Sequence, residues 1–183
     1  SDLGTQAALP GDMPVPIPHL RLVIDGLVED LAIDRCILGS VHEAAGAGSS
    51  SMACTAARIA ITDSILLPHG ADPVLSLESA ELTIERSTIL GDCFLGRAEI
   101  GNSIIDGMLE VQDAQGSCLR FSAVRTGGRI PSPYESVILP GGLPPGSFES
   151  VRFGDAGLCA ITPACPVEVA TGGENRTEMG AFN

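Results

Sequence analysis

The chain has almost no aromatic side chains. Tryptophan is absent and only 3% of the 183 residues are aromatic, although 44% are hydrophobic. The core must therefore consist of Ile, Leu, Val and Ala. Such a core suits stacked coils of short strands, in which small branched side chains form ladders and bulky rings have little room.

Positive charge is also scarce. Ten Arg and no Lys face 23 acidic residues, which gives a formal net charge of −13. No basic stripe is present that could displace counterions from a phosphate backbone, so nucleic acid is excluded as a partner, and anionic membrane surfaces are disfavoured. We attribute the absence of lysine to the coding bias of a GC-rich genome, and the acidity to solubility.

Long hydrophobic runs are missing as well. No apolar run approaches the roughly 20 residues that a membrane span requires, and no signal peptide is recognisable. We therefore expect no membrane span and a cytoplasmic location. Because the chain opens with Ser1 and Asp2 and no Met, we expect that an upstream segment precedes it.

Six cysteines occur, and Cys36 stands where other repeats have serine. A residue that is interchangeable with Ser at a corner is a small packing residue, so we expect reduced thiols. Cys118, Cys159 and Cys165 could supply three thiolates to a metal, but their spacing departs from the close pairs of structural zinc sites. A Cys159–Cys165 disulfide and plain buried thiols remain as alternatives, and we expect no cofactor.

Apolar residues recur in short groups that are separated by tight corners. The spacing between these groups is too long for an amphipathic helix. Four segments superpose: 31–38, 59–66, 82–90 and 98–105, with starts separated by 28, 23 and 16 residues. Each carries a Ser or Cys after a polar pair, where a short side chain can hydrogen-bond backbone groups of a corner. The pattern predicts an all-β fold, a right-handed parallel β-helix: a triangular solenoid with about 16–23 residues per coil.

Three parts follow from this pattern. Residues 1–18 form a Pro-rich arm, residues 19–122 form the coils, and residues 123–183 form a Pro/Gly-rich loop and a C-terminal capping segment. Loops at 43–57 and 68–73 interrupt the coils. We expect the capping segment to be a β cap that closes the open end of the solenoid.

Two groups of polar residues are candidate sites. Asp34, Asp63 and Glu85 occupy equivalent places in successive repeats, and stacked on one edge they would form a carboxylate ladder for glycan cleavage. The second group could bind an acidic ligand or partner, or could pair with surrounding acids. It comprises Arg120, Arg125, Arg129 and Tyr134.

The segments Leu82–Gly91, Cys118–Ser122, Phe148–Cys159 and Glu178–Phe182 carry a resemblance. With them, residues 20–183 resemble the C-terminal half of large bacterial β-helix proteins that accompany phage-tail-like, contractile-injection gene clusters. The resemblance implies a domain of a longer protein, with protein partners in a multi-protein assembly, and it carries over no catalytic residues.

Two functional hypotheses follow. The first is a non-enzymatic structural or docking module, which could also form homo-oligomers. The alternative is a β-helix that binds or cleaves polysaccharide, as a lyase or hydrolase. The scarcity of aromatic platforms disfavours the alternative, and a concave groove with convergent acids would favour it.

Overall fold

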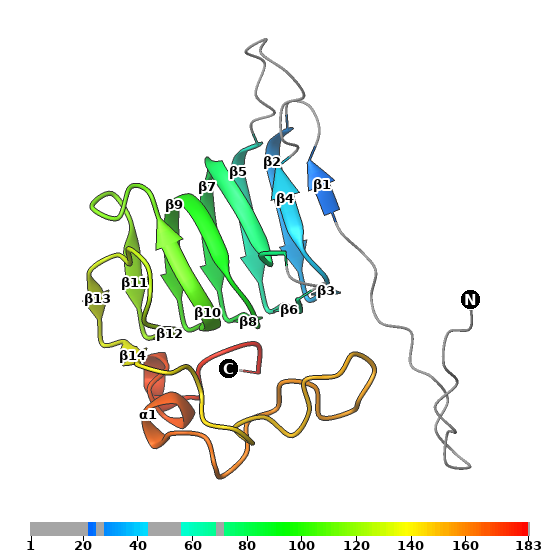
Figure 1. Ribbon diagram of the computed structural model, residues 1–183, viewed down its shortest axis with the longest axis vertical. Coiled ribbons are helices and arrows are strands. Elements are labelled where there is room, and N and C mark those ends of the chain that lie inside the picture. The colour runs from blue at the N-terminus through cyan, green and yellow to red at the C-terminus, as the bar shows by residue number, and fades with distance from the viewer. Residues whose placement is uncertain (1–21, 25–27, 44–55, 69–71, 183) are drawn as a thin grey trace.

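The computed structural model describes residues 22–24, 28–43, 56–68 and 72–182, and its regular structure is almost entirely β (Figure 1). Within these ranges, fourteen strands form one sheet. They are β1 (Leu22–Ile24), β2 (Val28–Asp34), β3 (Ile37–Leu38), β4 (Val41–Glu43), β5 (Ala56–Thr62), β6 (Ile65–Leu66), β7 (Leu75–Glu85), β8 (Thr88–Ile89), β9 (Cys93–Gly101), β10 (Ile104–Val111), β11 (Cys118–Arg120), β12 (Ala123–Arg125), β13 (Pro133–Tyr134) and β14 (Val137–Leu139). The all-β prediction is confirmed.

The sheet is parallel throughout and curls around a common core. The strands pair in three ladders. Ladder A contains β2, β5, β11, β13 and the second halves of β7 and β9. Ladder B contains β3, β6, β8, β12, β14 and the start of β10. Ladder C contains β1, β4, the first parts of β7 and β9 and the end of β10. We call each passage through A, B and C a repeat.

The strand register reproduces the sequence repeat. Ile33 pairs with Ile61, Ile61 with Ile84 and Ile84 with Ile100, which are steps of 28, 23 and 16 residues. All four side chains are buried, and most of the corresponding inward positions of the other ladders are buried too, with Leu22, Leu38 and Ile138 partly buried. Burial of one such side chain contributes roughly 1.5–3 kcal/mol. The core is therefore a stack of aliphatic rows.

A row of short side chains lines the corner between ladders A and B. Five backbone N–H groups in this row each donate to the hydroxyl of the equivalent residue in the next repeat, at 3.1–3.2 Å. Each hydroxyl donates in turn to the carbonyl two residues before it, at 2.6–3.0 Å. The row is Cys36, Ser64, Ser87, Ser103, Ser122 and Ser136. Cys36 imitates the serines by donating to the Asp34 carbonyl, which confirms the prediction for this corner.

The residue before each member of this row adopts a left-handed backbone. Its φ lies between 44° and 50° in Arg35, Asp63, Arg86, Asn102, Phe121 and Glu135. Such a conformation is costly for a residue with a Cβ. Five of the six N–H groups donate to a carbonyl of the next repeat at 3.1–3.2 Å, so the stacked neighbours hold the strained corner in place.

The C-terminal segment 140–182 contains only a one-turn helix α1 (Val167–Ala170), a short 3-10 helix η1 (Glu174–Arg176) and isolated bridges. It packs against the outward side of ladder B, below the sheet in Figure 1, where Met179 contacts the cluster of Ile104 and Ala123. The Gly180 N–H donates to the Asn102 carbonyl at 2.8 Å. The predicted β cap over the end of the solenoid is therefore wrong: the segment covers a side, because the outward positions of ladder B are apolar.

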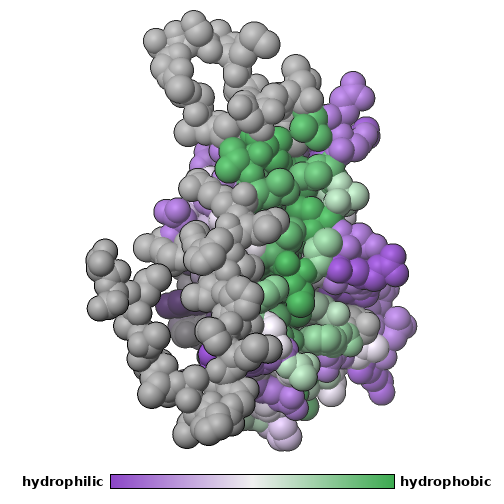
Figure 2. All heavy atoms as spheres, turned by 90° about the vertical axis from the view of Figure 1, so that its right-hand side faces the viewer, coloured by the Kyte–Doolittle hydropathy of each residue, from purple (hydrophilic) through white to green (hydrophobic). Residues whose placement is uncertain are grey.

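The end of the sheet that carries β1, β2 and β3 presents a hydrophobic band between hydrophilic flanks (Figure 2). Val23 and Ile37 are 48% and 45% exposed there. Ladders A and B continue beyond residue 122 through β12, β13 and β14. The arm 1–18 and most of the loops 43–57 and 68–73 lie outside the described residues, as do His19, His69 and Cys54.

Candidate docking surface

The outward side of ladder A carries three rows of side chains that run from repeat to repeat, and we call it the ladder A face. The register defines the rows as Asp30, Arg58, Glu81 and Arg97; then Ala32, Ala60, Thr83, Glu99 and Cys118; then Asp34, Thr62, Glu85, Gly101, Arg120 and Tyr134. The strand period of two places these residues outward and the aliphatic rows inward.

The middle row forms the floor of a shallow groove. Ala32, Ala60 and Thr83 are smaller than their neighbours on either side, and the groove above them has a volume of about 440 Å³. It runs across β2, β5, β7 and β9, perpendicular to the strands. The ladder A face thus carries a groove whose long axis follows the direction in which the repeats stack.

The first row alternates in charge. Arg58 Nε lies 2.8 Å from Asp30 Oδ1, and Arg97 Nη1 lies 3.2 Å from Glu81 Oε1. These four side chains are 50% to 68% exposed, so the pairs contribute little to folding stability. Their charges remain available to a partner.

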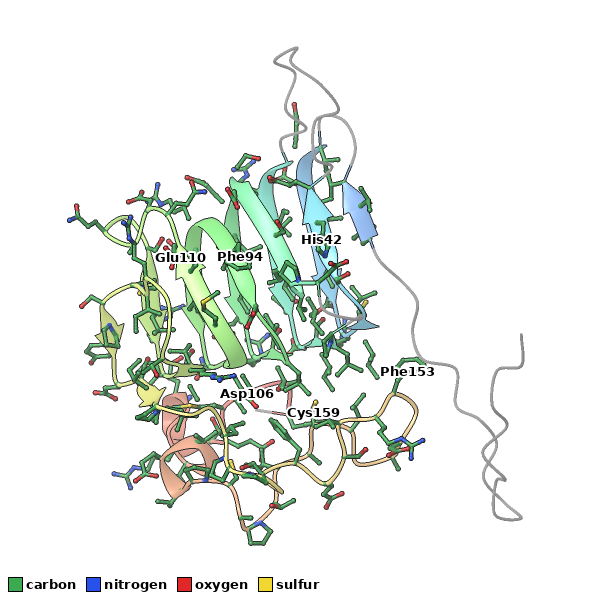
Figure 3. All side chains as sticks on the ribbon, viewed as in Figure 1. His42, Phe94, Asp106, Glu110, Phe153 and Cys159 are labelled. Atoms are coloured by element: carbon green, nitrogen blue, oxygen red, sulfur yellow. The ribbon has the colours of Figure 1, made fainter. Side chains whose placement is uncertain are left out.

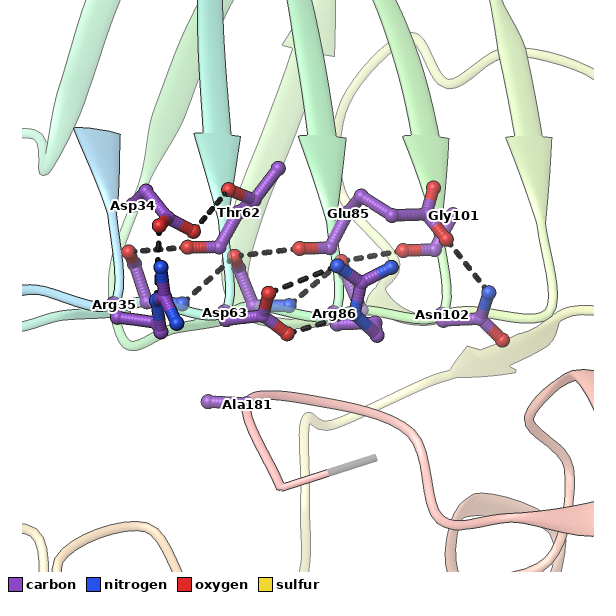
Figure 4. Close-up of polar contacts among 12 residues, drawn as sticks. Asp34, Arg35, Thr62, Asp63, Glu85, Arg86, Gly101, Asn102 and Ala181 are labelled. Carbon is purple, nitrogen blue, oxygen red and sulfur yellow. Dashed lines mark hydrogen bonds and ion pairs between the residues drawn. The ribbon is translucent and has the colours of Figure 1, made fainter. Parts of the chain in front are cut away.

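The third row does not contain all three predicted carboxylates (Figure 4). Asp34 pairs with Thr62, and Thr62 pairs with Glu85. Asp63 lies one residue further along, in the row of left-handed corner residues, where it is followed by Arg86. The expected ladder of Asp34, Asp63 and Glu85 was therefore out of register by one residue.

Each of these carboxylates has a cationic or polar partner. Arg86 donates two hydrogen bonds to Asp63, at 2.7 and 2.8 Å, and this holds the pKa of the Asp63 carboxyl below its usual value and raises the pKa of Arg86. Asp34 receives the Thr62 hydroxyl at 2.8 Å. Glu85 receives the Asn102 amide at 2.7 Å.

This arrangement suits binding better than acid catalysis. A general acid needs a raised pKa, and paired carboxylates in glycosidases converge across a cleft. The pKa of Asp63 is instead lowered, and Arg side chains stand between the acids on this face. The groove is concave, but its acids do not converge.

The second predicted group is divided among the ladders. Arg120 and Tyr134 pair on ladder A, where Arg120 Nη2 lies 3.6 Å from Glu85 and the Tyr134 ring packs edge-on against Phe121. Arg125 belongs to β12 on ladder B. Arg129 donates to the Gln112 carbonyl at 3.0 Å, beside ladder C.

The three candidate thiolates are also apart. Cys118 is exposed on the ladder A face, Cys165 is buried with Met179, and Cys159 is buried with Leu158 between the sheet and the C-terminal segment (Figure 3). Both buried thiols are free, and burial raises the pKa of Cys159 to about 12. Within the described ranges, no three His, Cys, Asp or Glu residues are grouped to hold a metal ion.

Arg58 and Arg97 were not among the residues that sequence reasoning selected. The signal was available, because Asp30, Arg58, Glu81 and Arg97 directly precede the first apolar residue of the four superposed segments. Extending the alignment by one residue toward the N-terminus reveals the alternating row.

No helix among the described residues is both long and apolar enough to cross a bilayer. No protein family, no curated protein and no solved structure matches this chain.

Proposed function

We propose that this protein is a non-enzymatic docking module of a larger bacterial assembly, and that the ladder A face is its docking surface. The sequence resemblance suggests a phage-tail-like contractile injection system as that assembly. One observation carries the proposal: the ladder A face and its corner hold half of the arginines of a strongly acidic chain, and these alternate with carboxylates.

The charge count makes this surface distinct. Five Arg and seven acids lie on the ladder A face and its corner, a net charge of −2 in a chain whose formal charge is −13. The arginines are Arg35, Arg58, Arg86, Arg97 and Arg120, and the acids are Asp30, Asp34, Asp63, Glu81, Glu85, Glu99 and Glu135. An interface of alternating charges gives specificity and register to association.

The scaffold below the surface is rigid. The backbone of ladder A is fixed by parallel pairing across β2, β5, β7, β9 and β11, and by the hydroxyl row at its corner. A surface that does not reorganise loses little conformational entropy when it binds.

The fold and location belong to the same proposal. The three ladders of parallel strands support a β-helix of triangular cross-section, and the strong preference of parallel strands for right-handed crossovers supports its right-handed course. The free thiols of Cys36, Cys93, Cys118, Cys159 and Cys165 support a reducing, cytoplasmic location.

The test is retention of partners on the immobilised chain. Proteins encoded next to it should be retained by the wild-type chain and by Arg152→Glu, which reverses a charge outside the ladder A face. The double variant Arg58→Glu/Arg97→Glu should lose them. Failure of the wild-type chain to retain any of them, or equal retention by the double variant, would contradict the proposal.

The groove itself favours one second candidate, polysaccharide binding or cleavage. It is concave, it crosses four strands and its walls carry hydroxyl, carboxylate and guanidinium groups. Incubation with polysaccharides should release reducing ends if the groove is catalytic, and Glu81→Gln and Glu99→Gln, which replace carboxylates that line the groove, should abolish that release. We expect no release from the wild-type chain.

A further inference from the structure

We propose that a second copy of this chain docks on the ladder A face, with the repeats of the two copies stacked in opposite directions. This inference rests on the docking function proposed above and names the partner of that surface. It follows from the order of charges in the first row.

The row Asp30, Arg58, Glu81, Arg97 is complementary to its own reverse. A two-fold axis parallel to the strands, between β5 and β7, reverses the order of the repeats and keeps each row opposite itself. It places Asp30 opposite the second copy's Arg97, and Arg58 opposite the second copy's Glu81. All four contacts in the row are then between opposite charges, and an interface of this kind is isologous.

The other two-fold arrangement is unfavourable. An axis along the stacking direction places the first row opposite the third row. Asp30 then faces Asp34, and Glu81 faces Glu85. Like charges placed opposite each other across an interface are costly, so the charge pattern selects the antiparallel arrangement.

The rest of the surface is compatible with this contact. Ala60 comes to lie opposite the second copy's Thr83, so small side chains meet at the axis. The groove leaves the long Arg side chains of both copies room to lie across the floor. Elsewhere the strongly acidic chain repels a second copy, whereas the ladder A face is nearly neutral.

The size of the face sets the expected affinity. A strand of seven residues spans about 23 Å and the four strands that overlap across the axis span about 19 Å, so each copy buries on the order of 400 Å². This area is smaller than that of standard specific interfaces and is typical of weak, transient contacts. We therefore expect a weak dimer that depends on protein concentration and on salt.

Sedimentation velocity on the full chain tests the proposal. The wild-type chain should form a dimer as its concentration rises from micromolar to millimolar at low salt, and high salt should dissociate it. In Arg58→Glu, the new carboxylate of each copy faces Glu81 of the other copy, so two contacts become repulsive. The dimerisation affinity should fall by roughly tenfold or more. The double variant R58E/E81R restores opposite charges across the interface and should recover the dimer, and Arg152→Glu should leave it unchanged.

A wild-type chain that stays monomeric throughout, or a dimer that Arg58→Glu does not weaken, would overturn the second-copy proposal. Thermal unfolding checks that the variants are folded. We expect them to fold, because the substituted side chains are exposed. The docking function is judged separately: if the monomeric chain retains a neighbouring protein that the double variant R58E/R97E loses, docking stands and the second copy falls. If the dimer forms as expected and no other protein is retained, the second-copy proposal stands and docking of other proteins is contradicted.

Discussion

The hydroxyl of Ser87 accepts a hydrogen bond from the backbone N–H of Ser64, one repeat earlier, at 3.2 Å. The same hydroxyl donates to the Glu85 carbonyl at 2.9 Å. Both serines are buried. One side chain thus satisfies two backbone groups from two repeats, and the same contact recurs along the whole corner.

Replacement of this hydroxyl should destabilise the fold. Ser87→Ala leaves the Ser64 N–H without its acceptor, which costs about 1–3 kcal/mol for a buried group. Urea denaturation measures this change in the free energy of unfolding. Ser132→Ala, on an exposed serine, should stay within about 0.5 kcal/mol of wild type. Equal stability of the two variants would show that the hydroxyl row does not tie the repeats together.

The left-handed corner residues give a second prediction. Glu135 is exposed and has a φ of 44°. Glu135→Gly relieves the strain of a side chain in this region, whereas Glu135→Val increases it, because a β-branched residue tolerates positive φ poorly. Both changes remove the same carboxylate. The glycine variant should exceed the valine variant by about 1–2 kcal/mol in unfolding free energy, and the opposite order would contradict the corner geometry.

Gly107 tests how closely the repeats stack. A Cβ at this position would lie 2.1 Å from the backbone carbonyl carbon and oxygen of Gly91, one repeat earlier. Gly107→Ala must therefore move the backbone, and we expect a loss of roughly 2–4 kcal/mol. Gly141→Ala meets no atom within 4 Å and should be nearly neutral. A nearly neutral Gly107→Ala would show that the two corners are not in contact.

The partial burial of Glu178 predicts that the stability of the fold depends on pH. Partial burial within the C-terminal segment raises the pKa of its carboxyl. A raised pKa in the folded state means that its stabilising contribution is present at low pH and is lost as pH rises through that pKa. Glu178→Gln should therefore raise the melting temperature by roughly 1–2 °C near pH 7 and leave it unchanged near pH 3.

Asp63 supplies the contrast. Its pKa is lowered by the hydrogen bonds from Arg86, so its contribution is present above the unfolded-state pKa and is lost as the pH falls through the folded-state pKa. Asp63→Asn should destabilise near pH 7, and this destabilisation should diminish as the pH falls through the folded-state pKa. If both variants shifted stability equally at both pH values, the two environments would not be as described.

The repeat could be predicted from the sequence because it is local. Ile33, Ile61, Ile84 and Ile100 mark the same inward position in each copy, and the serine after the polar pair marks the corner. The prediction of the outward polar row was wrong by one residue. Thr62, not Asp63, aligns with Asp34, and Asp63 instead forms an ion pair with Arg86.

The course of the C-terminal segment could not be predicted in the same way. Its contacts join residues far apart in the chain, such as Ala181 and Thr88, whose hydroxyl accepts the Ala181 N–H at 3.1 Å. Outward residues such as Ile104 and Ala123 look in sequence like ordinary strand positions. These apolar side chains indicate that another segment packs on ladder B, but the sequence periodicity does not identify that segment.

The central claim is that opposite charges on the ladder A face join two copies of the chain, and a mixture of two variants tests it most directly. Arg58→Glu alone and Glu81→Arg alone each place like charges opposite each other in a homodimer. When the two are mixed, the carboxylate introduced at position 58 of one variant faces the guanidinium introduced at position 81 of the other, and every contact in the row is again between opposite charges. Sedimentation velocity should show each variant as a monomer and the equimolar mixture as a heterodimer. A mixture that sediments as monomers, under conditions in which the wild-type chain is dimeric, would contradict the account.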